Sequence, residues 1–217
     1  KTVGETQVWT GSEATDGEII VNAPNLERNT KTDVLTATGG VKYFSKKANL
    51  LCDKAVIYRK EKRAVLTGHV SMLVKPEDQE KLEVVEIQPF RPVVPEEIAA
   101  SRPKHPSQKT EEQKKQDEEL RSSKNPRKYP ISIAAEKIEY WYRKGERRAV
   151  VTGSPEALQE FPNGRWRRMG TAKAYYDAEK ESLRLESTEG KKDTRVITSI
   201  GDDLIATWFL TSTKENG

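Results

Sequence analysis

The sequence has few of the residues from which catalytic and metal sites are usually built. Cysteine occurs once, as Cys52, so neither a disulfide within one copy nor a cysteine-based zinc site can form. Histidine occurs twice, as His69 on an expected strand and His105 in a proline-rich stretch, and both are interpreted as ordinary surface residues. We therefore expect no metal, no cofactor and no chemistry at Cys52.

Long hydrophobic runs and a dominant charge are also missing. No run of about 18 apolar residues is present, which excludes a membrane-spanning helix, and the sequence opens without the apolar core of a signal peptide. If the protein is exported, we expect this to be its mature form. The 38 basic and 34 acidic residues leave a net charge of only +4 and alternate along the chain, which argues against a nucleic-acid partner.

Motifs for common chemistry are absent from the sequence as well. No glycine-rich phosphate loop ending in Gly-Lys-Ser or Gly-Lys-Thr occurs, and no nucleophile with a base or paired carboxylate is recognisable. We therefore predict that the protein is not an enzyme. An enzyme acting on envelope glycan stays open as an alternative, because a wide groove could hold sugars.

An internal repeat is what the sequence does contain. Residues 53–68 form a strand, a basic turn and a second strand that ends in glycine, and residues 136–153 repeat this order. Weaker copies cover 21–39 and 172–185. Because Val, Ile, Thr and Tyr dominate and apolar residues alternate with polar ones, we predict an all-β fold of repeated antiparallel strands, with glycines such as Gly68 and Gly153 at the turns that close the units.

The repeat pattern breaks between Pro76 and Pro130, where prolines recur and a long polar run follows. We predict one domain over residues 1–217, in which residues 76–130 are a proline- and charge-rich insertion. Residues 111–121 have good helix propensity and lack proline, so they are expected to form a solvated helix or to remain disordered.

The two strong units resemble a known family. The Asp53-Lys54-Ala55 start, the Thr67-Gly68 end and the run from Gly153 to Gln159 are similar to the OstA-like domain of lipopolysaccharide transport proteins of the LptA type. The resemblance covers about residues 18–75 and 131–210, and departs from the family at the insertion and at Glu136, where aspartate is usual.

This resemblance implies a folded-over, solenoid-like open sheet, a β-taco or β-jellyroll, with an apolar groove for lipid acyl chains. It also implies a periplasmic location and end-to-end self-association. The assembly would bridge an inner-membrane transporter and an outer-membrane insertase.

Alternation along the strands gives a set of candidate groove residues. Because inward positions must be apolar and outward ones polar, we predict that the groove is lined by Ile19, Val21, Leu35, Ala37, Leu66, Ile138, Tyr140, Val150, Leu158 and Leu183. A register slip of one residue would invert some of them. The four tryptophans and the strand tyrosines could fill the core or line the groove.

Basic residues recur at the turns of both strong units. Arg59 and Lys60 in the first unit correspond to Arg143 and Lys144 in the second, and equivalent turns of a solenoid stack along one edge. Together with Arg165 and Arg167 they are candidates for contacts to the phosphates of a lipid headgroup. The alternative is that they are solvated hairpin tips.

The predicted function is passive binding and transport of lipopolysaccharide or a similar amphipathic lipid, driven by an ATP-dependent partner. The alternative is a structural β-solenoid, a scaffold or adhesin whose interior is filled by its own side chains.

Overall fold

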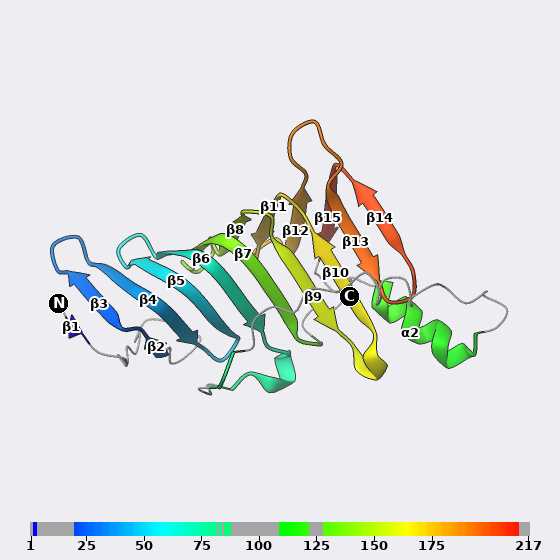
Figure 1. The fold of residues 1–217 in the computed structure, drawn as a ribbon, viewed down its shortest axis with the longest axis horizontal. Helices are drawn as coiled ribbons and strands as arrows, with labels where there is room; N and C mark the ends of the chain where they lie inside the picture. Colours follow the sequence, from blue (N-terminus) through cyan, green and yellow to red (C-terminus); the bar gives the residue numbers. More distant parts are fainter. Residues whose placement is uncertain are drawn as a thin grey trace.

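The computed structural model describes residues 2–3, 20–81, 83, 85–87, 109–121 and 128–212. Fifteen strands form one sheet in which neighbouring strands are antiparallel, which confirms the all-β prediction (Figure 1). The strands are β1 (Thr2–Val3), β2 (Ile20–Asn22), β3 (Asn25–Asn29), β4 (Val34–Phe44), β5 (Ala48–Tyr58), β6 (Arg63–Val74), β7 (Ile131–Trp141), β8 (Arg148–Thr152), β9 (Glu156–Glu160), β10 (Trp166–Gly170), β11 (Lys173–Asp177), β12 (Ser182–Glu186), β13 (Thr194–Thr198), β14 (Asp203–Ala206) and β15 (Trp208–Ser212).

The sheet is folded over into two half-sheets along a line that crosses its strands. Half-sheet 1 contains β3, residues 34–38, 54–58, 63–67 and 137–141, and strands β8, β11, β12 and β15. Half-sheet 2 contains β2, residues 41–44, 48–51, 70–74 and 131–134, and strands β9, β10, β13 and β14. Strands β4 to β7 run through both halves, whereas later strands belong to one half each.

Glycines mark the fold line, and this corrects the expectation that Gly68 and Gly153 close the units at turns. The register shifts between Thr67 and Val70, where Gly68 has a φ of 77°. A Cβ on Gly68 would lie 2.2 Å from the Asp53 carboxylate, and one on Gly153 would lie 2.3 Å from the Glu136 side chain. The repeated acidic residue and glycine are therefore two sides of one close contact at the fold, through the carboxylate of Asp53 and through Cβ and Cγ of Glu136.

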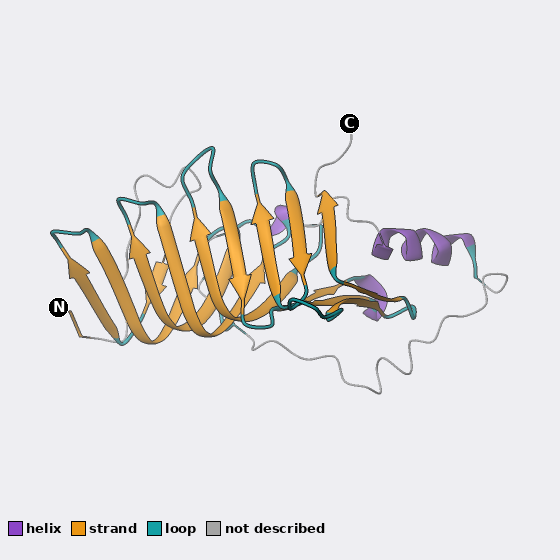
Figure 2. Ribbon diagram, turned by 90° about the horizontal axis from the view of Figure 1, so that it is seen from above, coloured by secondary structure: helices purple, strands orange, loops and turns teal. Residues whose placement is uncertain are grey.

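The four sequence repeats are the four hairpins of half-sheet 1. These hairpins are β3–β4, β5–β6, β7–β8 and β11–β12, and Figure 2 shows their tips in a row along one side of the molecule. Backbone hydrogen bonds join each tip to the next: Arg59 N–H to the Asp33 carbonyl, Tyr142 to Lys62 and Ala178 to Arg147. The predicted stacking of equivalent turns is thus confirmed.

The largest buried cluster joins the two half-sheets across the fold. Val21 and Leu50 of half-sheet 2 pack with Ala37, Ala55 and Ile138 of half-sheet 1. Val41, Cys52, Val70 and Ala135, which flank the fold line, complete the cluster with Ala23. The faces that carry these side chains therefore point toward each other, and we call them the inner face.

The insertion contains the helix that its composition favours. Helix α2 (Glu111–Arg121) coincides with the expected range, and two short 3-10 turns, η1 (Glu77–Gln79) and η3 (Pro162–Gly164), follow β6 and β9. The helix is not fully solvated, because Asp117 and Leu120 are buried. It lies beside the lower ends of β10 and β13 in Figure 1.

Candidate functional site: the inner face of the folded sheet

The inner face of half-sheet 1 carries two apolar rows that cross the strands. Cross-strand register fixes both rows, since directly opposed residues point to the same side of a sheet. The row next to the fold line contains Leu26, Ala37, Ala55, Leu66, Ile138, Val151, Ala174, Leu185 and Phe209. The next row outward contains Leu35, Ile57, Ala64, Tyr140, Ala149, Tyr176 and Leu183.

Half-sheet 2 offers a matching apolar row on its inner face. Its members are Val21, Tyr43, Leu50, Met72, Ile133, Ala157, Met169, Val196 and Leu204. Two apolar rows therefore run the length of the folded sheet and a third runs from β4 to β12, which together form a surface suited to long hydrocarbon groups.

Burial along these rows changes from one end of the sheet to the other. Val21 and Leu50, at the amino-terminal end, are 2% and 3% exposed. Met169 and Val196, further along the same row, are only half-buried, and Leu204 at its end is 54% exposed. This row of half-sheet 2 is therefore closed by its own side chains at the amino-terminal end and accessible at the other end. In the row next to the fold line, Ala174 and Leu185 stay buried.

Seven of the ten predicted groove residues share the inner face: Val21, Leu35, Ala37, Leu66, Ile138, Tyr140 and Leu183. Their alternation along each strand was sufficient to place them. Ile19 lies outside the described residues.

Val150 and Leu158 lie on the opposite face. Val150 is directly opposed to Glu139 and Tyr175, so the inner positions of β8 are its neighbours Ala149 and Val151. Leu158 packs with Trp166 and Ile197 in a second buried cluster on the outer face of half-sheet 2. Both side chains are apolar on a strand with apolar neighbours, so alternation alone could not choose their face.

Sequence reasoning did not assign several residues of β10, β11 and β13 to the inner face. Tyr176 of β11, Met169 of β10 and Val196 of β13 belong to the rows above. The signal that places them is their register against already assigned neighbours, which requires knowing which strands pair.

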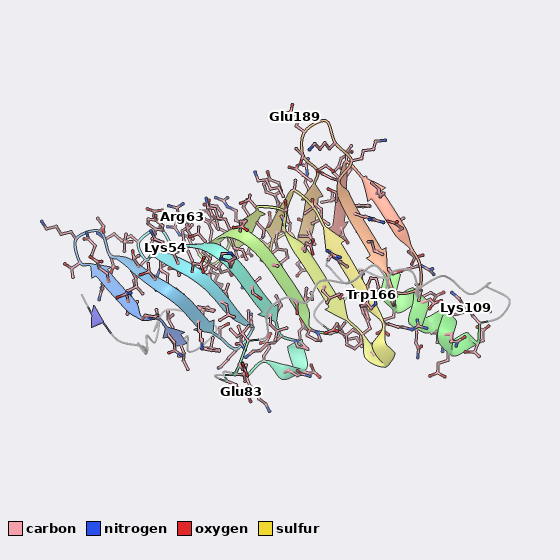
Figure 3. All side chains as sticks on the ribbon, in the orientation of Figure 1. Lys54, Arg63, Glu83, Lys109, Trp166 and Glu189 are labelled. Atoms are coloured by element: carbon pink, nitrogen blue, oxygen red, sulfur yellow. The ribbon has the colours of Figure 1, made fainter. Side chains whose placement is uncertain are left out.

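Four of the six candidate phosphate residues lie on one rim. Arg59, Lys60, Arg143 and Lys144 are at the tips of the β5–β6 and β7–β8 hairpins, and Figure 3 places their neighbour Arg63 along the same side. Arg59 forms an ion pair with Asp33 at 3.5 Å, and Lys60 donates to the Lys31 carbonyl. Acidic residues thus offset part of the positive charge of this rim.

Arg165 and Arg167 are instead engaged by the insertion helix, far from that rim. Arg165 pairs with Asp117 of α2 at 2.5 Å, and Lys109 pairs with the same carboxylate at 2.7 Å. Burial alone would raise the pKa of Asp117, but its hydrogen bonds to these two cations outweigh burial and lower it. Asp117 therefore fastens α2 to the loop between β9 and β10 as a charged group.

Arg167 reaches the helix from the inner face of β10. Its guanidinium donates to the Leu120 carbonyl at 3.2 Å and to Gln159 Oε1 at 2.7 Å, and burial lowers its pKa. Arg121 adds a two-bond ion pair to Asp202 in the turn before β14. The last turn of α2 is thereby held at the rim of half-sheet 2, next to the inner face.

The sheet ends in edges of opposite character. At the amino-terminal end, β3 carries mainly polar side chains and is paired to β1. At the other end, β15 pairs with β12 and β14 with β13, and neither pairs with another described strand on its other side. Trp208 and Leu210 of β15 are 56% and 62% exposed, and Leu204 and Ile205 of β14 are also exposed.

Groups that could support other chemistry are few in the described chain. Burial raises the pKa of the Cys52 thiol to about 12, so this thiol stays protonated at neutral pH. Within the described ranges, no group of three or more His, Cys, Asp or Glu side chains is placed to hold a metal ion. In the same ranges, helices are too short and too polar to cross a bilayer.

Comparison with known proteins gives likenesses to solved structures. No protein-family model and no curated protein matches the sequence. The structure is similar to that of LptH, the LptA-homologous periplasmic component of the lipopolysaccharide transport device from Pseudomonas aeruginosa. The two share 13% sequence identity over 83% of this chain and 92% of the other, with a TM-score of 0.48.

Proposed function

We propose that the protein binds the acyl chains of lipopolysaccharide or a related amphipathic lipid on its inner face and serves as a passive periplasmic conduit. The observation that carries the proposal is the run of apolar rows along the inner face, of which the two rows away from the fold line become accessible toward the carboxyl-terminal end, at Tyr176 and Leu204. The resemblance of the repeats around Gly68 and Gly153 to LptA-type proteins supports the same conclusion.

The energy of binding comes from hydrocarbon contacts. Each buried CH₂ contributes about 0.8 kcal/mol, so one chain of roughly a dozen carbons gains on the order of 10 kcal/mol before ordering costs. Headgroup phosphates would stay in water beside the hairpin tips, where exposed Lys144 and Arg143 contribute about 0.5–1 kcal/mol each. The apolar rows determine affinity, and the basic rim orients the lipid.

Transport along the face needs continuity between subunits. The exposed β14 and β15 edges can add the opposite end of a second copy or of a like domain by β-augmentation, which would extend the apolar rows. The difference between the two ends makes such contacts head-to-tail. Direction would come from an ATP-driven partner at one membrane and an insertase at the other.

The experiment that tests lipid binding compares adjacent tyrosines of β11. Native mass spectrometry with lipopolysaccharide should show lipid adducts for the wild type and far fewer for Tyr176→Asp, because this substitution places a charge on the inner face. Tyr175→Asp is the matched control, since Tyr175 points to the outer face.

Leu183→Asp, in the same inner row, provides a second inner-face variant. Circular dichroism should show that all three variants keep the β-sheet signal. Equal adducts in all of them would place the lipid elsewhere, and no adducts in the wild type would favour the scaffold.

A further inference from the structure

The inner face of half-sheet 2 has a further row, next outward from its apolar row, and this row changes character along the sheet. Cross-strand register places in it Ala48, Val74, Ile131, Gln159, Arg167 and Thr198. The members on β5, β6 and β7 are apolar, whereas those on β9, β10 and β13 are polar. The change falls where the neighbouring apolar row, at Met169 and Val196, is only half-buried. A polar row therefore borders the accessible part of the apolar surface.

Strand β10 carries two arginines on this face. Arg165 directly precedes the strand with an extended backbone, so Arg165, Arg167 and Met169 point to the same side. Residues two apart on a strand are about 7 Å from each other. A hydrocarbon chain that contacts Met169 thus meets first one cation and then a second on the way to the rim. This order, an apolar contact followed by positive charge, suits a lipid that carries an anionic headgroup.

Each of these arginines binds an oxygen atom of α2, which lies at the carboxyl-terminal end of the folded sheet (Figure 2). Asp117 Oδ1 accepts from Arg165 at 2.5 Å, and the Leu120 carbonyl accepts from Arg167 at 3.2 Å. The other carboxylate oxygen of Asp117 accepts from Lys109 at 2.7 Å. Asp117 and Leu120 are three residues apart and share one face of the helix. The helix therefore offers the two arginines an anion and a second oxygen, the kind of partner that a phosphate provides.

The helix itself is held mainly by charge. Leu120 is the one apolar side chain of α2 and is fully buried. Beyond the contacts of Asp117, a two-bond ion pair joins Arg121 to Asp202. A helix of 11 residues is marginal in water without tertiary contacts, and one apolar side chain gains little from the hydrophobic effect. A second anion at the two arginines would therefore compete directly with the docking of α2.

We propose that Arg165 and Arg167 form a phosphate subsite at the rim of half-sheet 2, and that α2 is a latch whose Asp117 occupies this subsite until a lipid phosphate displaces it. The subsite rests on the proposed function, because the acyl chains are taken to lie on the apolar row that contains Met169. The exchange replaces one anion by another, so neither arginine is left as an uncompensated buried charge.

The test uses two lipids that differ only in the phosphate, dioctanoyl phosphatidic acid and dioctanoylglycerol, with the full chain. Native mass spectrometry measures binding, and hydrogen exchange reports on the amides of residues 111–121. We expect the phosphatidic acid to bind about tenfold more tightly and to speed exchange in α2, because a displaced helix of this length unfolds. Dioctanoylglycerol should bind without changing exchange in α2.

Three variants separate a latch from a merely structural contact. Asp117→Asn removes the competing charge, so phosphatidic acid should bind about tenfold more tightly than to the wild type, because more of the protein has an open subsite. Loss of a structural contact alone would not raise affinity. Glu118→Gln is the matched control, since it removes the same charge from an exposed position of α2 and should leave affinity unchanged. Arg165→Gln should reduce the preference for phosphatidic acid over dioctanoylglycerol.

The outcomes distinguish this proposal from the one on which it rests. Equal binding of the two lipids by the wild type would overturn the subsite and leave acyl-chain binding on the inner face intact. Unchanged exchange in α2 with bound phosphatidic acid, or unchanged affinity in Asp117→Asn, would overturn the latch. No binding of either lipid would overturn the proposed function and the subsite with it.

Inorganic phosphate is the last probe. Faster exchange in α2 with inorganic phosphate alone would show that the subsite takes free phosphate as well. An effect of phosphatidic acid only would identify the headgroup of a bound lipid as the ligand.

Discussion

The amino-terminal and carboxyl-terminal parts of this sheet are built from the same repeat, but their inner faces differ in how closely they pack. Strands β4 to β7 cross the fold line without interruption and press the inner faces into one buried cluster. Beyond β7 the two half-sheets are built from separate short strands, such as β11 with β12 in one half and β10 with β13 in the other. Where the strands are split, the inner row of half-sheet 2 is half-buried or exposed from Met169 to Leu204, whereas Ala174 and Leu185 next to the fold line stay buried.

The sharpest test of this comparison is the same truncation at both ends. Leu50→Ala should cost about 2–5 kcal/mol in the free energy of unfolding, because Leu50 is fully packed and its removal leaves a cavity. Leu183→Ala, on the half-buried part of the inner face, should cost less than about 1.5 kcal/mol, since less contact is lost. Urea unfolding measures both. Equal losses would show that the carboxyl-terminal inner face is as tightly packed as the amino-terminal one.

The glycines of the fold line give the second comparison. Gly68→Ala and Gly153→Ala should each destabilise by about 1–3 kcal/mol, because the new Cβ meets Asp53 or Glu136 at a positive φ. Gly145→Ala, also at positive φ but with open space around it, should cost about 1 kcal/mol. Thermal or urea unfolding ranks the three. If Gly145→Ala costs as much as the others, backbone strain rather than the carboxylate contact explains the motif.

The exposed carboxyl-terminal edge predicts a change in association rather than in folding. Replacing Trp208 and Leu210 with lysine should weaken self-association by at least about tenfold, because the substitutions remove apolar contacts and add like charges on an edge strand. Sedimentation over a concentration series measures this, with Glu27→Lys on polar β3 as a charge control. A wild type that is monomeric at every concentration would contradict self-association through this edge.

The smallest expected effect is a dependence of stability on pH, and it arises beside only one of the two fold-line glycines. His69 and Ser154 occupy equivalent places after Gly68 and Gly153, both at positive φ, but only His69 titrates. The hydrogen bond that His69 Nδ1–H donates to the Asp53 carboxylate at 2.8 Å raises the pKa of His69, so the pair contributes its stability below the ordinary histidine value. This contribution is lost as the pH rises through the raised pKa.

Proton NMR of His69 should show a pKa above that of a free histidine, and Asp53→Asn should lower it. Because both side chains are exposed, the change in unfolding stability should be slight. An unchanged pKa in Asp53→Asn would show that the pair is absent in solution.

The sequence by itself determined the repeat, the β class and the hairpin positions, and it left residues 111–121 as either a helix or a disordered segment. These features are local, because alternation, turn residues and helix propensity act within a few residues. The segment from Tyr58 to Arg63 therefore predicts a hairpin without reference to any other strand. The shared face of seven candidate residues followed from the same alternation.

Only the tertiary structure decided the rest. Whether Val150 or Val151 faces inward depends on register against β7 and β11, which no local pattern fixes. Arg165 and Arg167 appear as free cations in the sequence, but Asp117 and Leu120, some 50 residues away, bind them. Likewise, only the folded sheet shows that Gly68 packs against Asp53 and Gly153 against Glu136. Local propensities determine where strands and turns form, whereas long-range strand pairing determines which side chains come into contact.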